Sequence, residues 1–100
     1  MNNKPTINEI KEKLHPILQN NQIIQAILFG SYAKGVANEK SDVDILIDSG
    51  GKLKGIDFFG VLDEITHVLG VPVDLIEMSQ VEKGGRIEKE IAETGVVLYG

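Results

Sequence analysis

Two aspartates stand two residues apart: Asp42 directly precedes a short apolar stretch over residues 43–48, and Asp44 is its second residue. Residues two apart on a strand point to the same face, so the two carboxylates are expected side by side. They repel each other and resist losing water, and a divalent cation between them removes both penalties. Magnesium prefers oxygen ligands, so paired aspartates together with substrate phosphates suit it. Taken alone, the pair is explained more simply by two solvated acids at a strand end.

A third aspartate, Asp74, strengthens the hypothesis of a metal site. It lies within residues 71–76, an otherwise apolar stretch that predicts a strand, where an unpaired acid is costly. If that strand is next to the one carrying Asp42 and Asp44, all three carboxylates reach one centre. Three carboxylates can hold two ions that activate the attacking oxygen and stabilise the leaving oxygen of a phosphoryl displacement. The alternative for Asp74 is a strand terminus or a single salt bridge.

Gly30 and Ser31 follow residues 23–29, an apolar run typical of a buried strand. Glycine lets the backbone approach a ligand closely, and the free amides of a helical turn with the Ser31 hydroxyl favour phosphate. Alone, the dipeptide is explained more simply by a strand-to-helix turn with Ser31 as N-cap. Ser41, just before Asp42, is a turn residue or orients that carboxylate.

The elements predicted around these residues alternate along the chain. A helix begins at the capping box Thr6–Glu9 and is kinked or interrupted at Pro16, which lacks the amide proton. A second helix is capped by Asp57 and ends at Gly70. A third begins at another capping box over residues 79–82, is broken at Gly84-Gly85, and resumes at residues 86–93. Strands are expected over residues 23–29, 43–48, 71–76 and 96–99.

This alternation predicts an α/β (α+β) fold, a mixed sheet of about four strands covered by helices. The helical connection between the second and third strands is long enough for a parallel crossover, whereas residues 31–41 are too few for one. A length of 100 residues predicts one domain, 1–100. We expect no acceptor-binding lobe, so the second wall of a cleft is expected from a partner or a second copy of the chain.

Composition excludes several classes of function. The net charge of -5 argues against an extensive nucleic-acid surface, although a small phosphate ligand fits if a metal ion supplies positive charge. No apolar run approaches the ~18 residues of a membrane span, so no membrane association is expected. The chain has no cysteine and hence no disulfide framework or thiolate metal site. A cytoplasmic location is the default expectation.

The combined motif, residues 30–35 (Gly-Ser-Tyr-Ala-Lys-Gly), a short loop, then residues 41–44 (Ser-Asp-Val-Asp), resembles a known signature. It is similar to that of the DNA polymerase β-like nucleotidyltransferase superfamily, and most similar to the minimal prokaryotic branch, often encoded beside a HEPN-domain partner. The likeness extends over residues 23–76 and loosely to residues 96–99. Lys34 stands where arginine is frequent; lysine keeps the charge but loses the bidentate fork.

The resemblance implies a role for each site residue. Gly30 and Ser31, with Ser41 beside them, bind the triphosphate of ATP or another nucleoside triphosphate. Two magnesium ions are held by the carboxylates Asp42, Asp44 and Asp74, of which the last also helps to activate the acceptor hydroxyl. The implied reaction is attack on the α-phosphate with loss of pyrophosphate, which places AMP on a protein hydroxyl, often a tyrosine of the HEPN partner.

Two other functions remain open at this point. An antitoxin-type binding module that neutralises a HEPN partner by contact, with weak or no catalysis, fits the small size. A plain α/β domain with acids at its strand ends requires no ligand. Lys83 and Arg86 flank the Gly84-Gly85 break and are expected to be solvated charges, with contact to phosphate or a partner as the alternative.

The histidines and phenylalanines are not assigned to the site. His15 and His67 have no partner at metal-ligand spacing and are expected at the surface. Phe58 and Phe59 fit the apolar face of the helix that follows Asp57, so both are predicted to pack in the core.

Overall fold

The computed structural model describes residues 4–100 and is built on one four-stranded sheet. Strand order is β3-β2-β1-β4, where β1 is Gln25–Phe29, β2 is Val43–Asp48, β3 is Val73–Glu77 and β4 is Val96–Tyr99. β1 is antiparallel to β2 and β4, whereas β2 and β3 are parallel. The predicted mixed sheet is confirmed, and its parallel pair is joined by the long helical crossover.

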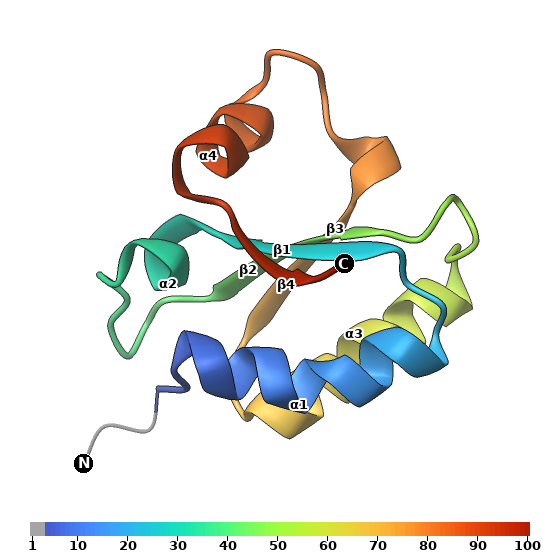
Figure 1. The fold of residues 1–100 in the computed structure, drawn as a ribbon, viewed down its shortest axis with the longest axis horizontal. Helices are drawn as coiled ribbons and strands as arrows, with labels where there is room; N and C mark the ends of the chain where they lie inside the picture. The colour runs from blue at the N-terminus through green and yellow to red at the C-terminus, as the bar shows by residue number, and fades with distance from the viewer. Residues whose placement is uncertain (1–3) are drawn as a thin grey trace.

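Helices cover both faces of the sheet (Figure 1). Helices α1 (Ile7–Asn20) and α3 (Ile56–Leu69) lie together on one face, and α4 (Arg86–Thr94) lies on the other. The short helix α2 (Gly30–Lys34) follows β1 directly, and the 3-10 helix η1 (Met78–Gln80) follows β3. Val43, Ile45 and Ile47 of β2 are completely buried in the core. Because side chains alternate along a strand, this burial turns Asp44 toward the face that α4 partly covers.

Helix α1 runs through Pro16 without a break, which corrects the expected interruption. The predicted capping box is present: Glu9 N donates to Thr6 Oγ1 and Thr6 N donates to Glu9 Oε1, both over 3.1 Å. Pro16 and Glu12 are both exposed, so water reaches the Glu12 carbonyl that proline leaves without a donor. Burial of the opposite face of α1 holds the helix together across this position.

The start of helix α3 also differs from the prediction. The helix begins at Ile56, after Gly55, so Asp57 lies inside its first turn and does not cap it. Its buried stripe is Val61, Ile65 and Leu69, at a spacing of four. Phe58 packs at the margin of the core. Phe59 follows it about 100° further around the helix axis and is 63% exposed. The prediction that Phe59 belongs to the core was therefore wrong.

The capping box predicted over residues 79–82 does not form. Glu77 instead caps η1, its carboxylate accepting a hydrogen bond from Ser79 N at 3.4 Å. The strand therefore passes straight into a single 3-10 turn, and helix α4 begins only at Arg86, after Gly84-Gly85. Strands β1 and β3 each begin two residues later than predicted.

Candidate active site

Strand register places Asp44 between the end of β1 and Asp74. Phe29 is paired with Asp44 across β1 and β2, and Asp44 is paired with Asp74 across β2 and β3. Neighbouring strands lie about 4.8 Å apart and paired residues point to the same face, so these two carboxylates are direct neighbours. Gly30 follows Phe29 immediately. The predicted turn and two of the three predicted acids thus form one row across the sheet.

Gly30 lies directly against the Asp44 carboxylate. A Cβ atom added to Gly30 would be only 2.3 Å from Asp44 Oδ2, and the residue has a φ of +75°. Both the contact and the left-handed backbone require glycine here. The sequence predicted that Gly30 lets the backbone approach a ligand closely. In the structure, the group that lies close to Gly30 is the Asp44 carboxylate of the neighbouring strand.

The other predicted residues lie around this row. Ser31 is half-buried in the first turn of α2, and Asp42 is exposed just before β2. Burial raises the pKa of the Tyr32 hydroxyl, and the charge of Asp42 adds to the rise, so Asp42 lies near α2. Ser41 Oγ accepts a hydrogen bond from Asn38 N at 2.9 Å. That bond closes a surface turn, the simpler of the two interpretations of Ser41, and its role toward a nucleotide stays a prediction.

Like charges surround the Asp44 carboxyl. Burial, the largest cause, and the negative charges of Asp74, Glu90 and Asp42 together raise its pKa to about 6, against the opposing charge of Arg86. The oxygen donors of Asp42, Asp44 and Asp74 are of the kind that magnesium prefers. Between residues 4 and 100, no three acidic, histidine or cysteine side chains form a ready-made metal site. These carboxylates fit magnesium only if further oxygen ligands, such as substrate phosphates, complete the set.

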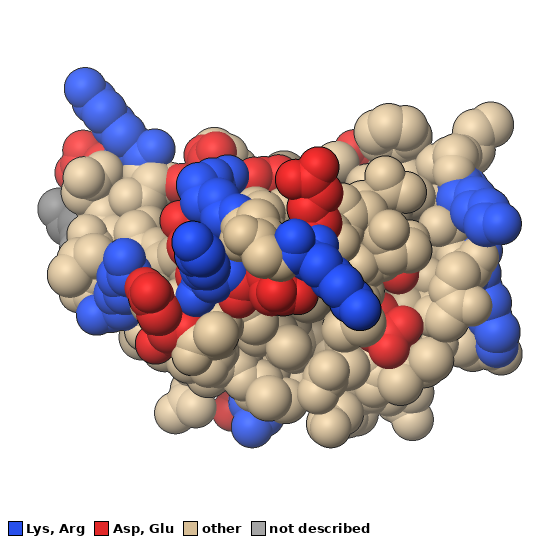
Figure 2. All heavy atoms as spheres, turned by 90° about the horizontal axis from the view of Figure 1, so that it is seen from above, with Lys and Arg blue, Asp and Glu red and all other residues tan. Residues whose placement is uncertain are grey.

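Helix α4 brings three residues to this site: Arg86, for which contact to phosphate was the alternative interpretation, and Glu90 and Thr94, for which the sequence indicated no role. Arg86, Glu90 and Thr94 are spaced by four and therefore share one helix face. Gly30 N donates to Thr94 Oγ1 at 3.2 Å, Thr94 Oγ1 donates to the Glu90 carbonyl at 2.7 Å, and Arg86 Nη1 lies 3.1 Å from Glu90 Oε1. For Glu90 and Thr94, the spacing of four was the only signal in the sequence. Figure 2 shows the molecule from above, with acidic and basic side chains gathered together on this side.

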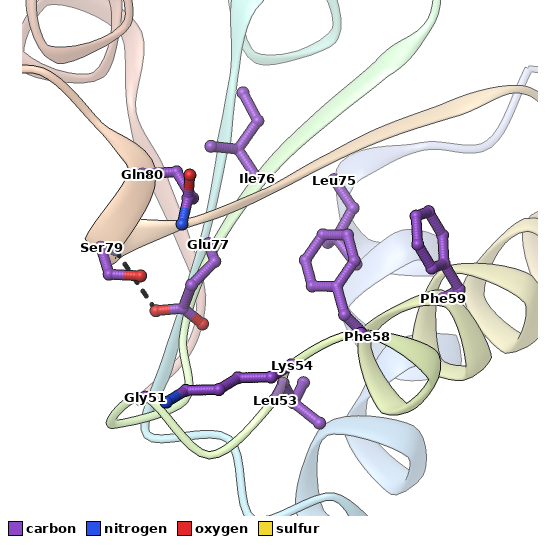
Figure 3. Close-up of a pocket in the computed structure, with 11 residues that line it drawn as sticks. Gly51, Leu53, Lys54, Phe58, Phe59, Leu75, Ile76, Glu77, Ser79 and Gln80 are labelled. Atoms are coloured by element: carbon purple, nitrogen blue, oxygen red, sulfur yellow. Dashed lines mark hydrogen bonds between the residues drawn. The ribbon is translucent and has the colours of Figure 1, made fainter.

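A separate groove of about 510 Å³ lies beside β3 and is lined by none of the predicted site residues. Its walls come from the start of α3, the loop before it, β3 and η1 (Figure 3). Phe58 and Phe59 of α3 and Leu75 and Ile76 of β3 contribute to its lining, and in Figure 3 Leu75 is on the side of the phenylalanines while Ile76 points away from them. This groove is a second concave surface, and its apolar walls distinguish it from the acidic site.

A buried hydrogen-bond network joins Ser49 to Glu77, which lines that groove. Ser49 and Glu77 are 1% and 7% exposed, and Ser49 Oγ donates to Glu77 Oε2 at 2.6 Å while accepting from Leu53 N at 3.2 Å. Ser49→Ala removes a donor from a buried carboxylate and an acceptor from a backbone amide. We expect the free energy of unfolding in urea to fall by about 2–3 kcal/mol. The control is Ser79→Ala, which keeps the hydrogen bond from the backbone N–H of this position to Glu77. It should change the free energy of unfolding by less than about 0.5 kcal/mol.

The raised pKa of Asp44 predicts that its ionised carboxylate destabilises the folded chain when no metal is bound. The folded-state pKa of about 6 exceeds the ordinary 3.8, so the folded chain keeps a proton that the unfolded chain has released. Stability is therefore lost as pH rises from about 4 to about 6. Asp44→Asn should raise the free energy of unfolding at pH 7 by about 1 kcal/mol, a value reduced for solvent screening. The gain should vanish near pH 4, as thermal unfolding at the two pH values would show.

The fold is that of a minimal nucleotidyltransferase, and the family model described as "Polymerase beta, Nucleotidyltransferase" matches residues 12–100. The chain belongs to this nucleotidyltransferase family and is an enzyme of that class. A Methanocaldococcus jannaschii protein named as a candidate protein adenylyltransferase is 39% identical over 75 residues, 75% of this chain and 81% of the relative. The protein adenylyltransferase MntA of Thermococcus cleftensis is 39% identical over 57 residues, 57% of this chain and 58% of MntA.

Several solved structures share the fold. A toxin–antitoxin complex with AMP-PNP has a TM-score of 0.77 at 24% identity, covering 90% of this chain and 73% of the other. A complex of tri-AMPylated Shewanella oneidensis HEPN toxin with MNT antitoxin has a TM-score of 0.73 at 21% identity, covering 95% and 73%. A candidate minimal nucleotidyltransferase has a TM-score of 0.75 at 20% identity, covering 91% and 94%.

Across residues 4–100, no helix combines the length and apolar character needed to cross a membrane.

Proposed function

We propose that this chain transfers AMP from ATP to a hydroxyl group of a partner protein and releases pyrophosphate. The observation that carries the proposal is the row that crosses three neighbouring strands: the Gly30 turn at the end of β1, Asp44 on β2 and Asp74 on β3. The names of the relatives as protein adenylyltransferases support protein as the acceptor, and the AMP-PNP complex of a structural neighbour supports an adenine nucleotide.

In this proposal the triphosphate lies at the start of α2. The Gly30 amide already donates to Thr94, so phosphate contact falls to the Ser31 hydroxyl and the amides that follow it. Asp42, Asp44 and Asp74 would hold magnesium, which supplies charge neutralisation and Lewis acidity at the phosphates when bound. The raised pKa of Asp44 supports this, because clustered carboxylates without a cation repel one another.

Chemistry then takes place at the Asp74 side of the row. The acceptor hydroxyl oxygen forms a bond to the α-phosphorus, and the bond from that phosphorus to the oxygen bridging to the β-phosphate breaks. Pyrophosphate leaves with the bond electrons, and the hydroxyl proton passes to a carboxylate oxygen of Asp74. Asp74 is exposed on the edge strand β3, so a side chain of another protein can reach it from solvent.

The partner that we propose is a HEPN-domain protein, on the strength of the toxin–antitoxin complexes that share this fold. The test is incubation of the chain and a HEPN-domain protein with Mg²⁺ and ATP labelled at either the α- or the γ-phosphate. Label from the α-phosphate should enter the partner, with one pyrophosphate released per transfer. Transfer of the γ-label instead would identify a kinase and contradict the proposal.

A second function is favoured by the groove beside β3. Phe59 lines this groove and is 63% exposed, and Ile56, at the start of the same helix α3, is 89% exposed. Such a surface suits an antitoxin that neutralises its partner by contact. A variant with alanine at Asp42, Asp44 and Asp74 separates the two functions. Full neutralisation of the partner by this variant would show that contact is sufficient.

A further inference from the structure

We propose that Thr94 is a positioning residue of the active site, and that its hydroxyl holds the Gly30 turn so that the Asp44 carboxylate keeps the geometry that AMP transfer requires. The inference rests on the proposed function, because its measure is the rate of that transfer. It adds a residue from the end of α4 to the site that the Gly30 turn, Asp44 and Asp74 form on three neighbouring strands.

The Thr94 hydroxyl supplies the hydrogen-bond partner that the start of α2 lacks. Gly30 is the first residue of that helix, and the first amides of a helix have no carbonyl partner within it. Gly30 N donates to Thr94 Oγ1 at 3.2 Å. Thr94 Oγ1 donates its only proton to the Glu90 carbonyl at 2.7 Å, so a lone pair of the oxygen is left to accept from Gly30 N. Both contacts together fix the orientation of the hydroxyl.

The backbone around Thr94 fixes this hydroxyl relative to the Gly30 turn. Thr94 is the last residue of α4, and β4 begins two residues later and pairs with β1, the strand that leads into Gly30. A Cβ added to Gly95 would be 2.5 Å from the Ile91 carbonyl oxygen and 3.1 Å from Ile27 Cγ2, so the chain between α4 and β4 packs closely on β1. Thr94 and Gly30 are therefore held together by two neighbouring strands of one sheet.

Gly30 passes this contact on to the Asp44 carboxylate. A Cβ added to Gly30 would be 2.3 Å from Asp44 Oδ2, so there is no free space between the turn and the carboxylate. Without the Thr94 acceptor, the Gly30 amide is a part-buried donor with no partner, which costs free energy until the peptide turns toward another acceptor. Such a rotation displaces the Asp44 carboxylate, and a displacement of about 1 Å in a catalytic group costs about 100-fold in rate.

The test measures AMP transfer to a HEPN-domain protein, by pyrophosphate release over a range of ATP concentrations in Mg²⁺. Thr94→Val keeps the branched shape but removes the hydroxyl, and should lower kcat by about 30- to 100-fold. KM for ATP should change by less than about threefold, because the proposed phosphate contacts are the Ser31 hydroxyl and the amides that follow it. Thr94→Ser keeps the hydroxyl and should have a kcat within about threefold of wild type.

The matched control is Thr66→Val, the same loss of a hydroxyl on α3, which lies on the opposite face of the sheet from α4 (Figure 1). Its kcat should stay within about twofold of wild type. Urea unfolding of each variant measures the structural part of the effect, and Thr94→Val should lower the midpoint by about 1 M. A merely structural role of Thr94 would move this midpoint and leave the kcat of the folded chain unchanged.

A double variant tests whether Thr94 acts through Gly30. Gly30→Ala and Thr94→Val displace the same carboxylate, so Gly30→Ala/Thr94→Val should be no more than about threefold slower than the slower single variant. A folded Thr94→Val chain with the kcat of wild type, or a Thr94→Ser chain as slow as Thr94→Val, would overturn this inference and leave the proposed function standing. A folded wild-type chain that transfers no AMP would overturn both.

Discussion

Asp44→Asn should reduce AMP transfer by at least about 1,000-fold while leaving the chain folded. Asp44 is the central member of the acidic row, in contact with Gly30 and paired with Asp74, so no other described carboxylate lies where it does. Asparagine keeps the shape but loses the charge that holds magnesium, and metal assistance contributes several kcal/mol, equivalent to about three orders of magnitude in rate. Initial rates of pyrophosphate release with saturating ATP would measure the effect.

The matched control is Asp48→Asn on the same strand. The chemical change is the same as in Asp44→Asn. Asp48, however, lies at the far end of β2, where Asp48 Oδ1 accepts a hydrogen bond from Gly50 N at 2.9 Å. An asparagine oxygen can accept that bond, so activity should stay within about twofold of wild type. Transfer by Asp44→Asn at more than a tenth of the wild-type rate would remove Asp44 from the metal-binding set.

Gly30→Ala should destabilise the chain by about 2–4 kcal/mol and slow AMP transfer by about 100-fold. A φ of +75° strains any residue with a Cβ, at about 1–2 kcal/mol, and overlap with Asp44 Oδ2 adds the cost of overpacking. To relieve the overlap, the Asp44 carboxylate must move, and a displacement of about 1 Å in a catalytic group costs about 100-fold in rate. Urea unfolding and pyrophosphate release would measure the two effects.

Gly35→Ala separates backbone strain from displacement of Asp44. Gly35 has nearly the same φ, +76°, but a Cβ there would meet nothing within 4 Å. We expect Gly35→Ala to lose only about 1–2 kcal/mol of stability and to retain its transfer rate. If the two alanine variants were equally active, the contact between Gly30 and Asp44 would have no catalytic importance.

The acidic row could be predicted from the sequence because it depends on alternation within strands. Val43, Ile45 and Ile47 had to face the core, which fixed the direction of Asp44. The cost of an unpaired acid in an apolar strand pointed to Asp74, although Asp74 is exposed in the structure and does not bear that cost. The parallel pairing of those strands followed from the length of the connection between them. These inferences need only local patterns and the rules of strand connection.

The contribution of α4 could not be predicted in the same way. Whether the face with Arg86, Glu90 and Thr94 meets the active-site turn depends on how the helix is rotated against the sheet, which is a tertiary property. The hydrogen bond from Gly30 N to Thr94 joins residues 64 positions apart. The prediction for Phe59 failed for a related reason, since the rotation of α3 turns Phe58 toward the core and Phe59, one residue later, toward solvent.

The most direct test of the central claim is the intact mass of the HEPN partner after incubation with Mg²⁺, ATP and either the wild-type chain or Asp44→Asn. We expect the wild type to add whole AMP units to the partner, at a hydroxyl-bearing residue that peptide mapping would locate, and Asp44→Asn to add none. An unchanged partner mass with the wild-type chain, or an equal gain with Asp44→Asn, would contradict the account of this chain as an aspartate-dependent protein adenylyltransferase.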